Sequence, residues 1–418
     1  MSSRERTIRV LQIAPRVCWP LDTGAKLRNF HLGRILAQHA LVTLVAFATQ
    51  TQPRGNLQDF YRQVFAVRRD RHNSFLKVLR GAIGRTPLPL LNYTTRKMKQ
   101  ELIRILDVQD FDIVQLESIH LMPYLALIRR SARKRPVVVL DWHNIESELM
   151  QQYSEREANV FRRAYAKRTA RYMAAFERQA LREFDVHLVV SERDAQRLRK
   201  LNPDARIFVI ENGVDSAYYS DLAGGASDGT ATNNRIVFVA SMDYHANIDA
   251  AVSFARDVWP RVRERKAELI FTIVGRDPAP EVSALASIPG VQVTGAVDDV
   301  RPYYREARAA IVPLRVGGGS RLKILEAMAA GVPVISTTLG AEGLEVNAGE
   351  NILIANSGEE LRKAIIDLAE NADLSTRLIE AGRALISQRY DWSIPGAKLV
   401  EMYQTFLRQT SARSASGR

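Results

Sequence analysis

Two cations and a carboxylate follow a run of glycines in the stretch RVGGGSRLKILEAMAAGVPVIS, residues 315–336. A strand pattern, AAIVPL (309–314), precedes the glycines, and a helix is expected to begin after them. A glycine turn between a strand and a helix presents backbone N–H groups to an anion, and the helix dipole adds to the attraction. We therefore predict a diphosphate site formed by Gly317, Gly318, Gly319, Ser320, Arg321 and Lys323.

Glu326 lies in the same predicted helix, one turn after Leu322. A carboxylate is a poor phosphate ligand, but it accepts hydrogen bonds from two adjacent hydroxyl groups, such as those of a ribose. The pattern predicts that Glu326 binds a ribose while Arg321 and Lys323 stabilise the charge of a departing diphosphate in catalysis. The alternative is a solvent-facing Lys323–Glu326 pair on an ordinary surface helix. The sequence contains no GxxxxGK[ST] phosphate loop, and no GxGxxG motif follows its first strand.

Glycine and polar residues follow predicted strands in the first half of the chain. Ligands of parallel α/β sheets bind beside the carboxyl ends of the strands. We therefore predict that His143 and Asn144, which follow the buried strand PVVVLD, line a ligand cleft, and Gly24, Lys26 and Glu117 are further candidates in the same half of the chain. His143 is the candidate for a catalytic contact to a hydroxyl group, although a single histidine also serves structural roles. Gly24 and Lys26 have the alternative of an ordinary helix entry with an exposed lysine.

The elements that must position these residues alternate between strand and helix patterns along both halves of the chain. This alternation predicts parallel βαβ units and the α/β fold class. Residues 220–234, SDLAGGASDGTATNN, are poor in apolar side chains and indicate a linker or surface loop. The predicted organisation is an N-terminal domain (1–215), a linker (216–234), a nucleotide-binding C-terminal domain (235–390) and a C-terminal helix with a disordered tail (391–418).

The number of cysteines and the hydropathy of the chain indicate the cellular compartment of the protein. The single cysteine, Cys18, excludes a disulfide within the chain, which is typical of a reducing compartment. The first 15 residues lack the apolar segment of a signal peptide, and no apolar run approaches the roughly 20 residues that span a bilayer. These features predict a cytoplasmic protein.

The positive charge of the chain is concentrated in its first half. The whole chain carries a formal net charge of +13, of which residues 1–215 carry +15 and the remainder −2. A basic half favours a nucleic acid, an anionic membrane or an acidic ligand, and the alternative is a solvated basic surface. The predicted helix 155–183 interleaves arginines with aromatic side chains. It therefore suits either an anionic membrane or the packing of an apolar stripe on the sheet.

Several stretches together resemble the glycosyltransferases of the family 4 type, which have the GT-B fold. GGGSRLKILEAMAAGVPVIST resembles the signature of the family's second domain. In the first half, PLDTGAKLRNFHL (20–32) resembles its first glycine loop, and VIENGVD (209–215) resembles its hinge. The resemblance covers nearly the whole chain and is weakest over residues 50–105. The first half is most similar to bacterial sugar transferases of exopolysaccharide systems.

The resemblance implies two Rossmann-like domains facing each other across a cleft, the first for the acceptor and the second for a nucleotide sugar. It also implies that Gly24, Lys26 and Glu117 line the acceptor side of that cleft. It implies the transfer of a hexose from a nucleotide-diphosphate sugar to an acceptor, with retention of anomeric configuration. The leaving phosphate itself takes the acceptor's proton in such a reaction, so no protein base is required. An anionic lipid or a polyprenyl-diphosphate-linked acceptor suits the basic half, which implies peripheral attachment to the inner face of the plasma membrane.

The sequence departs from the family pattern at two places. Members often have two glutamates eight positions apart; Glu326 matches the second, whereas Gly318 stands at the first. The loop SMDYHAN (241–247) lacks the family's basic residues, so Arg321 and Lys323 are expected to supply the missing charge. No DxD motif stands where a metal-dependent transferase would hold Mg²⁺ or Mn²⁺, and no His/Cys cluster has zinc spacing. We therefore expect no metal and no other cofactor.

Two other functions remain as alternatives. A nucleotide-sugar 2-epimerase of the same fold requires several acid and base residues in the cleft, which the sequence does not reveal. A basic nucleic-acid-binding protein is more remote, because the charge lies outside the half with nucleotide signals and no nucleic-acid motif appears. The residues do not specify the sugar, the base, the acceptor or the oligomeric state.

Overall fold

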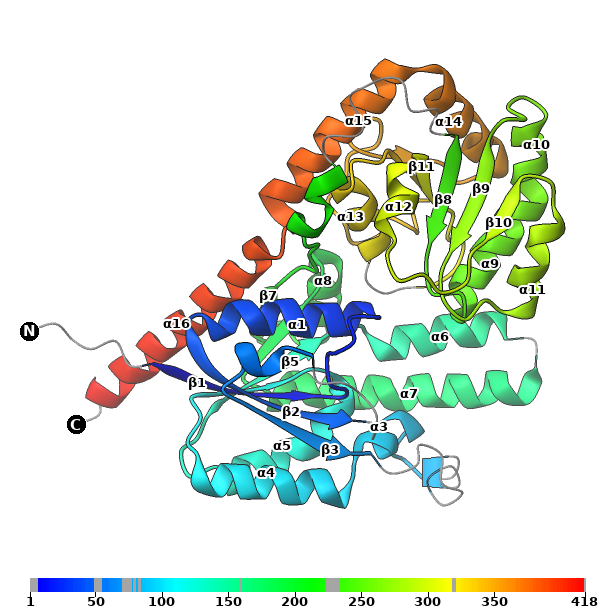
Figure 1. The fold of residues 1–418 in the computed structure, drawn as a ribbon. Coiled ribbons are helices and arrows are strands. Elements are labelled where there is room, and N and C mark those ends of the chain that lie inside the picture. The colour runs from blue at the N-terminus through cyan, green and yellow to red at the C-terminus, as the bar shows by residue number, and fades with distance from the viewer. Residues whose placement is uncertain are drawn as a thin grey trace, which may run out of the picture. The chain divides into compact units, whose positions relative to one another are not determined.

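The computed structural model describes residues 7–48, 55–69, 77, 80–81, 84–157, 159–222, 234–317 and 321–416 (Figure 1). The chain divides into two compact units: Met1–Asn212 with Trp392–Arg418, and Gly213–Asp391. Each unit is built on one parallel β-sheet, so the predicted α/β class with two domains is confirmed.

The first unit contains a seven-stranded sheet in the order β3-β2-β1-β4-β5-β6-β7. Its strands are β1 (Ile8–Ala14), β2 (Ala40–Ala48), β3 (Gln63–Arg68), β4 (Ile113–Leu116), β5 (Val137–Trp142), β6 (Val186–Val189) and β7 (Ile207–Val209). The direction of winding reverses between β1 and β4. Ligands of open α/β sheets bind at such a switch point, beside the carboxyl ends of the strands.

Helices cover both faces of this sheet. Leu11 and Ile13 of β1 belong to one core cluster, and Val10 and Ala14 belong to another. Because successive side chains of a strand point to opposite faces, the two clusters show that β1 contributes apolar side chains to the core on both sides of the sheet. The helices are α1 (Gly24–Ala37), α3 (Leu88–Tyr93), α4 (Arg96–Val108), α5 (Leu125–Ser131), α6 (Glu146–Arg156), α7 (Val160–Glu183), α8 (Glu192–Leu201) and α16 (Ser393–Ser416), with short 3-10 turns at Leu57–Asp59 and Ile119–Tyr124.

The second unit contains a six-stranded sheet in the order β10-β9-β8-β11-β12-β13, with its switch point between β8 and β11. Its strands are β8 (Arg235–Val239), β9 (Ile270–Val274), β10 (Val291–Val293), β11 (Ala307–Val312), β12 (Val334–Ser336) and β13 (Leu353–Ile354). Its helices are α9 (His245–Ser253), α10 (Trp259–Arg263), α11 (Pro280–Ser283), α12 (Arg301–Arg305), α13 (Leu322–Ala329), α14 (Gly358–Glu370) and α15 (Ala372–Leu385). π-helical segments continue α9 over Phe254–Val258 and α15 over Ile386–Tyr390, and 3-10 turns cover Ala217–Leu222 and Ala284–Ser287.

The last helix, α16, packs on the first unit. His31 of α1 stacks on Trp392, with ring centroids 5.2 Å apart. A Cβ atom at Gly396 would lie 2.5 Å from a side-chain carbon of Ile35, so the glycine allows the two helices to approach closely. Residues 411–416, which the sequence analysis assigned to a disordered tail, continue this helix. Most of the predicted linker, residues 223–233, lies outside the described residues.

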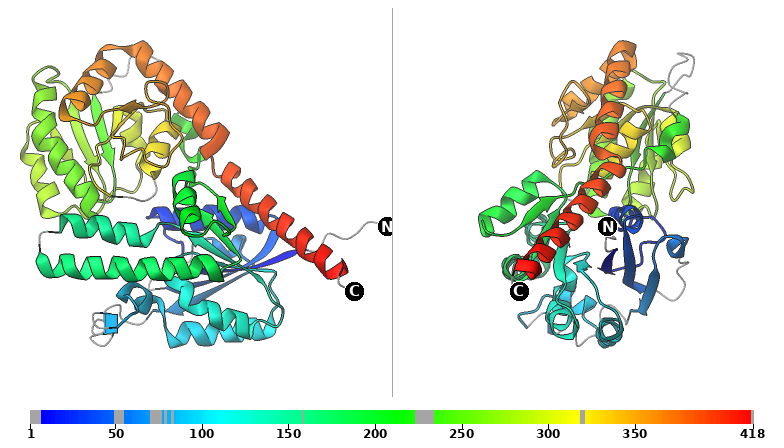
Figure 2. Two further views of the ribbon diagram at one scale, coloured as in Figure 1. Left: turned by 180° about the vertical axis from the view of Figure 1, so that it is seen from behind. Right: turned by 90° about the vertical axis from the view of Figure 1, so that its left-hand side faces the viewer.

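The long helix predicted over residues 155–183 corresponds to α7, which begins at Val160 and lies side by side with the preceding antiparallel helix α6 (Figures 1 and 2). The Asn159 side chain caps α7 by accepting hydrogen bonds from the backbone N–H groups of Phe161 and Arg162. A cap of this kind satisfies backbone donors that the first turn of a helix leaves unpaired, so it favours a helix start at this point. None of the helices in the described part of the chain combines the length and the apolar character needed to cross a bilayer.

Candidate functional site

The glycine-rich loop of the second unit runs from β11 to α13 at the switch point of the sheet. Gly317 has a φ of 98°, a conformation that side chains with a Cβ rarely adopt. A Cβ atom there would lie 2.8 Å from Cβ of Ala246 in α9. Glycine is thus required for this loop to approach the loop that follows β8. Gly318, Gly319 and Ser320 of the predicted diphosphate site lie outside the described residues.

Lys323 connects α13 to the start of α9. Its Nζ donates a hydrogen bond of 2.9 Å to Oδ1 of Asn247, whose amide in turn donates to the Ser241 carbonyl at 2.8 Å. Nζ also lies 5.6 Å from the centre of the Phe238 ring. The loop after β8 has no basic residue of its own, so Lys323 brings a positive charge to it from the neighbouring crossover.

Burial shifts the pKa values of both ionisable groups on α13. It raises the pKa of Glu326 to about 7, although nearby Lys323 opposes the shift. It lowers the pKa of Lys323 to about 8, and the positive charge of Arg321 contributes to this decrease. A pair with pKa values near neutrality is typical of ligand sites, because structural surface pairs are usually solvated and fully ionised. Lys323 and Glu326 are also half-buried, and the Lys323 head group binds Asn247, so the two residues differ from a solvent-facing surface pair.

Arg321 is oriented differently from Lys323. It is buried, its Nε donates to the backbone carbonyl of Glu342 at 3.2 Å, and its Nη2 lies 3.6 Å from the Glu342 carboxylate. Glu342 therefore binds the Arg321 guanidinium, whereas the Lys323 head group binds Asn247 in the first turn of α9.

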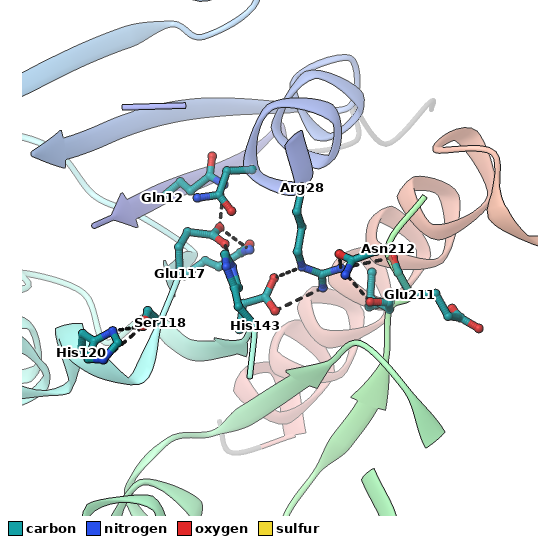
Figure 3. A network of polar contacts seen from close by, with 12 residues as sticks. Gln12, Arg28, Glu117, Ser118, His120, His143, Glu211 and Asn212 are labelled. Atoms are coloured by element: carbon teal, nitrogen blue, oxygen red, sulfur yellow. Dashed lines mark hydrogen bonds and ion pairs between the residues drawn. The ribbon is translucent and has the colours of Figure 1, made fainter. Parts of the chain in front are cut away.

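Glu117 and His143 meet in the first unit, beside the carboxyl ends of β4 and β5 (Figure 3). Nε2 of His143 lies 3.2 Å from Oε2 of Glu117. The other carboxylate oxygen accepts hydrogen bonds of 2.6 Å from the side-chain amides of Gln12 and Gln115. Gln115 in turn accepts a hydrogen bond from the hydroxyl of Tyr403 on α16. Because donors surround the buried carboxylate, Glu117 orients the imidazole ring of His143.

Asp141 lies next to this pair and is bound to Arg28. The guanidinium donates two hydrogen bonds of 2.9 and 3.1 Å to the Asp141 carboxylate, and both residues are fully buried. Arg28 also donates to the carbonyl of Ile210 at 2.8 Å, which ties α1 to the end of β7 (Figure 3). Ligand atoms of Glu117, Asp141 and His143 lie within 4.8 Å of one another, as a metal site requires. Both oxygens of Asp141 are nevertheless engaged by a cation, which leaves this set poorly suited to a second one.

The remaining predicted residues of the first unit lie at the start of α1 and after β5. Gly24 is the first residue of α1, and Lys26 is buried and forms an ion pair of 2.7 Å with Asp22. Asn144 is half-buried in the turn before α6. Lys26 is therefore not the exposed cation of the alternative interpretation, since its charge is already compensated.

Further acid and base groups lie near His143 that the sequence analysis did not assign to the site. Nε2 of His120 is 4.0 Å from the Glu146 carboxylate, and Nδ1 of His120 is 2.8 Å from the Ser118 hydroxyl. Burial lowers the pKa of His120 to about 4 and raises the pKa of Glu146 to about 7. Asp141 was also missed, although an aspartate at the end of the apolar run VVVLD is a signal, because a charge buried in a sheet needs a partner.

Two family models match this chain. The model described as "Glycosyltransferase Family 4" matches residues 42–218, and the model described as "Glycosyl transferases group 1" matches residues 233–371. A relative from Mycobacterium leprae, described as phosphatidyl-myo-inositol mannosyltransferase, is 30% identical over 161 residues, which are 37% of this chain and 42% of the relative. The match thus spans less than half the length of that relative.

Solved structures of similar fold cover almost the whole chain. Sucrose-phosphate synthase from Thermosynechococcus elongatus has a TM-score of 0.69 at 16% identity and covers 96% of this chain and 100% of its own. HepE from Anabaena, solved with UDP and glucose, has a TM-score of 0.65 at 16% identity, with 94% of this chain and 99% of its own covered. At 16% sequence identity, the similarity to these two structures establishes the fold of this chain and nothing further.

Proposed function

Because this chain belongs to the GT-B glycosyltransferases of the group 1 and family 4 type, we propose that it transfers a sugar from a nucleotide-diphosphate sugar to an acceptor, with retention of anomeric configuration. One observation carries the proposed donor site: Lys323 reaches Asn247 at the switch point of the second sheet, while Glu326 lies one turn further along α13. In this proposal Lys323 contacts the diphosphate and Glu326 accepts hydrogen bonds from the ribose.

In the proposed reaction the bond between the sugar and the diphosphate breaks first, positive charge develops on the sugar ring, and the new bond then forms on the same face of the sugar. Negative charge grows on the leaving phosphate, and Lys323 with the backbone N–H groups of the glycine turn stabilises it more strongly in the transition state than in the bound substrate. The phosphate oxygen accepts the proton of the attacking hydroxyl. In the first unit, Glu117 fixes the ring of His143, which hydrogen-bonds a substrate hydroxyl.

A panel of nucleotide sugars tests this function. The full-length protein is incubated with UDP, GDP and ADP sugars in excess EDTA, and thermal stabilisation and release of nucleoside diphosphate are measured. UDP is the first candidate, because HepE was solved with it. We expect one nucleotide class to stabilise the protein and to be hydrolysed slowly without metal. Absence of binding to every nucleotide, or activity that returns only with Mg²⁺ or Mn²⁺, would contradict the proposal.

A nucleotide-sugar 2-epimerase remains a second candidate, since the structure brings acid and base groups together in the first unit. Glu117, His143, His120 and Glu146 lie close to one another there. Incubation with the preferred nucleotide sugar in the absence of acceptor separates the two functions. An isomerised nucleotide sugar indicates an epimerase, whereas unchanged sugar with slow hydrolysis indicates a transferase. Nuclear magnetic resonance of the transferred sugar then reports whether its anomeric configuration is retained.

We further propose that the acceptor is a lipid-linked or polysaccharide precursor, such as a polyprenyl-diphosphate-linked sugar at the inner face of the bacterial plasma membrane. The Mycobacterium leprae relative is described as acting on a phosphatidyl-myo-inositol, which is an anionic lipid. The excess positive charge in the first half of the chain suits an anionic acceptor. Radiolabelled sugar transferred to extracted membranes, but not to soluble oligosaccharides, is the expected result; transfer to the soluble acceptors alone would exclude a lipid-linked acceptor.

A further inference from the structure

Two large apolar side chains stand in solvent at the start of α7. Phe161 is 87% exposed and Val160 is 68% exposed, which makes them the two most exposed large apolar residues in the described part of the chain. Every residue from Val160 to Tyr165 is exposed. Isolated exposed apolar residues are common in proteins, but a Val-Phe pair at the tip of a helical hairpin is an unusual place for them.

The rest of α7 packs in the ordinary way. Thr169, Ala170 and Met173 are buried on its inner face, and Arg168 donates to the carbonyl of Gly81 at 2.8 Å. These contacts anchor α7 to the rest of the first unit from its second turn onward. The first turn of α7 lies before them in the chain and is exposed. Figure 2 shows α6 and α7 side by side.

Basic side chains flank the apolar pair. Arg162, Lys167 and Arg171 are exposed, and the first turn of α7 contains no acidic residue. Glu155 and Glu157 precede this turn, and both carboxylates accept hydrogen bonds: Glu155 from the Gln151 side chain, and Glu157 from the Tyr153 hydroxyl and the Asn159 backbone. Apolar tip residues with a basic rim are complementary to a surface that is anionic outside and apolar beneath.

We propose that the α6–α7 tip, defined as Val160, Phe161, Arg162 and Lys167, binds an anionic lipid bilayer by inserting Val160 and Phe161 between the lipid headgroups. A second copy of this chain is a poorer occupant, because the basic rims would repel one another and two side chains fall far short of the roughly 800 Å² per partner of a stable interface. A soluble polyanion would satisfy the basic residues but would leave the apolar pair in water. Binding of the tip to a bilayer brings the proposed transferase to the surface that holds a lipid-linked acceptor. In this respect the inference rests on the proposed function.

Vesicle flotation with the full-length protein tests the proposal. The probes are vesicles of phosphatidylcholine alone and of phosphatidylcholine with phosphatidylglycerol, each at low and high salt, together with soluble polyphosphate. We expect binding to the anionic vesicles at low salt, weak binding to neutral vesicles and loss of binding as salt rises. Arg162→Gln and Lys167→Gln should each lower the partition coefficient about fivefold, which corresponds to about 1 kcal/mol for one basic residue near an anionic surface.

The decisive comparison is between Phe161→Ser and Val108→Ser. Val108 at the end of α4 is 64% exposed, close to the exposure of Val160, but its neighbours Asp107 and Asp110 are acidic. Phe161→Ser should reduce binding to anionic vesicles at least tenfold, Val108→Ser should not, and neither should change the thermal midpoint. Three results would overturn the proposal: no binding to anionic vesicles, equal binding of Phe161→Ser and the parent protein, or polyphosphate binding that matches vesicle binding. No sugar donor is present in this assay, so its outcome is independent of whether the chain transfers sugar.

Discussion

At the residue scale, the protonation of Glu326 and Lys323 determines when the proposed donor site is competent. Burial raises the pKa of Glu326 to about 7 and lowers that of Lys323 to about 8. An ionised Glu326 accepts hydrogen bonds from both ribose hydroxyls, so nucleotide affinity should rise as pH increases through 7. Lys323 loses its charge as pH increases through 8, so affinity for the diphosphate should then fall. Isothermal titration calorimetry from pH 6 to 9 measures this profile, and a flat profile would contradict the assignment.

Variants of Glu326 and Lys323 separate the rise in nucleotide affinity near pH 7 from its decrease above pH 8. Glu326→Gln should weaken nucleotide binding by about 10- to 100-fold, as expected for losing a hydrogen bond to a charged group, and should remove the rise near pH 7. Lys323→Met should remove the decrease above pH 8. Glu359→Gln is a suitable control, because Glu359 is an exposed glutamate of the same unit, paired with Arg362 on α14.

Glu117 offers a second test at this scale. Glu117→Gln keeps the shape of the side chain but replaces one of the two acceptor oxygens, which face Gln12, Gln115 and His143, by an NH2 group and removes the negative charge. We expect kcat to fall by about 10- to 100-fold, because the His143 ring loses a charge-assisted hydrogen bond that orients it. The donor KM should change little, since the proposed donor residues lie in the other unit. A change in KM with an unaltered kcat would mean that Glu117 does not orient a catalytic group.

At the element scale, the approach of the β11–α13 loop to α9 depends on one glycine. Gly317→Ala places a Cβ atom 2.8 Å from Ala246 and forces alanine into a φ of 98°. Gly349→Ala is the matched control, because Gly349 has a φ of 80° and no atom within 4 Å of the added Cβ. Each variant should lose about 1–2 kcal/mol of stability from backbone strain. Only Gly317→Ala should also weaken nucleotide binding at least tenfold, and equal affinities for the two variants would place the donor elsewhere.

Helix α16 links the carboxyl terminus of the chain to the His143 region. The Tyr403 hydroxyl donates to Gln115, Gln115 donates to Glu117, and Lys398 forms an ion pair of 3.0 Å with Glu211 at the end of the sheet. Burial raises the pKa of Tyr403, so this hydroxyl keeps its proton as a donor. The last helix therefore contributes to a polar network that begins on β4 and β5, nearly 300 residues earlier in the chain.

At the scale of the whole molecule, buried histidines make the first unit sensitive to acid. His187 on β6 accepts a hydrogen bond of 3.1 Å from the Trp142 indole, and burial lowers its pKa to about 4. Below pH 6.5 the unfolded chain binds a proton that the folded chain excludes, so stability falls as pH decreases toward 4. The slope from one such group is about 1.4 kcal/mol per pH unit.

The variant His187→Gln isolates this contribution, because glutamine keeps an acceptor for Trp142 but does not titrate. Between pH 7.5 and pH 5, the parent protein should lose about 2 kcal/mol more unfolding free energy than the variant. Glu146, whose pKa is raised, acts in the opposite direction, but it is common to both proteins and cancels from the comparison. Urea unfolding followed by tryptophan fluorescence at the two pH values measures the difference, and parallel losses would mean that His187 is not buried as a neutral side chain.

Structural features that depend on residues close together in the chain could be predicted from the sequence alone. The alternation of strands and helices predicted two parallel α/β units, because apolar periodicity reports burial directly. The spacing of Lys323 and Glu326 also placed both on one short helix after a glycine turn. The sequence also predicted a C-terminal helix within residues 391–418, and α16 begins at Ser393. The packing of this helix on the first unit did not follow from the sequence, because no local pattern reports which distant segment a helix will cover.

Only the tertiary structure decided which distant residues meet. Lys323 pairs with Asn247, Arg28 with Asp141 and Tyr403 with Gln115 because strand order and register bring separate crossovers to the same edge of a sheet. Along α7, Phe161 and Met173 are equally apolar in the sequence, yet the first stands in solvent and the second is buried. Periodicity identifies an apolar residue but not its partner, since a partner is determined by packing between segments that are far apart in the chain.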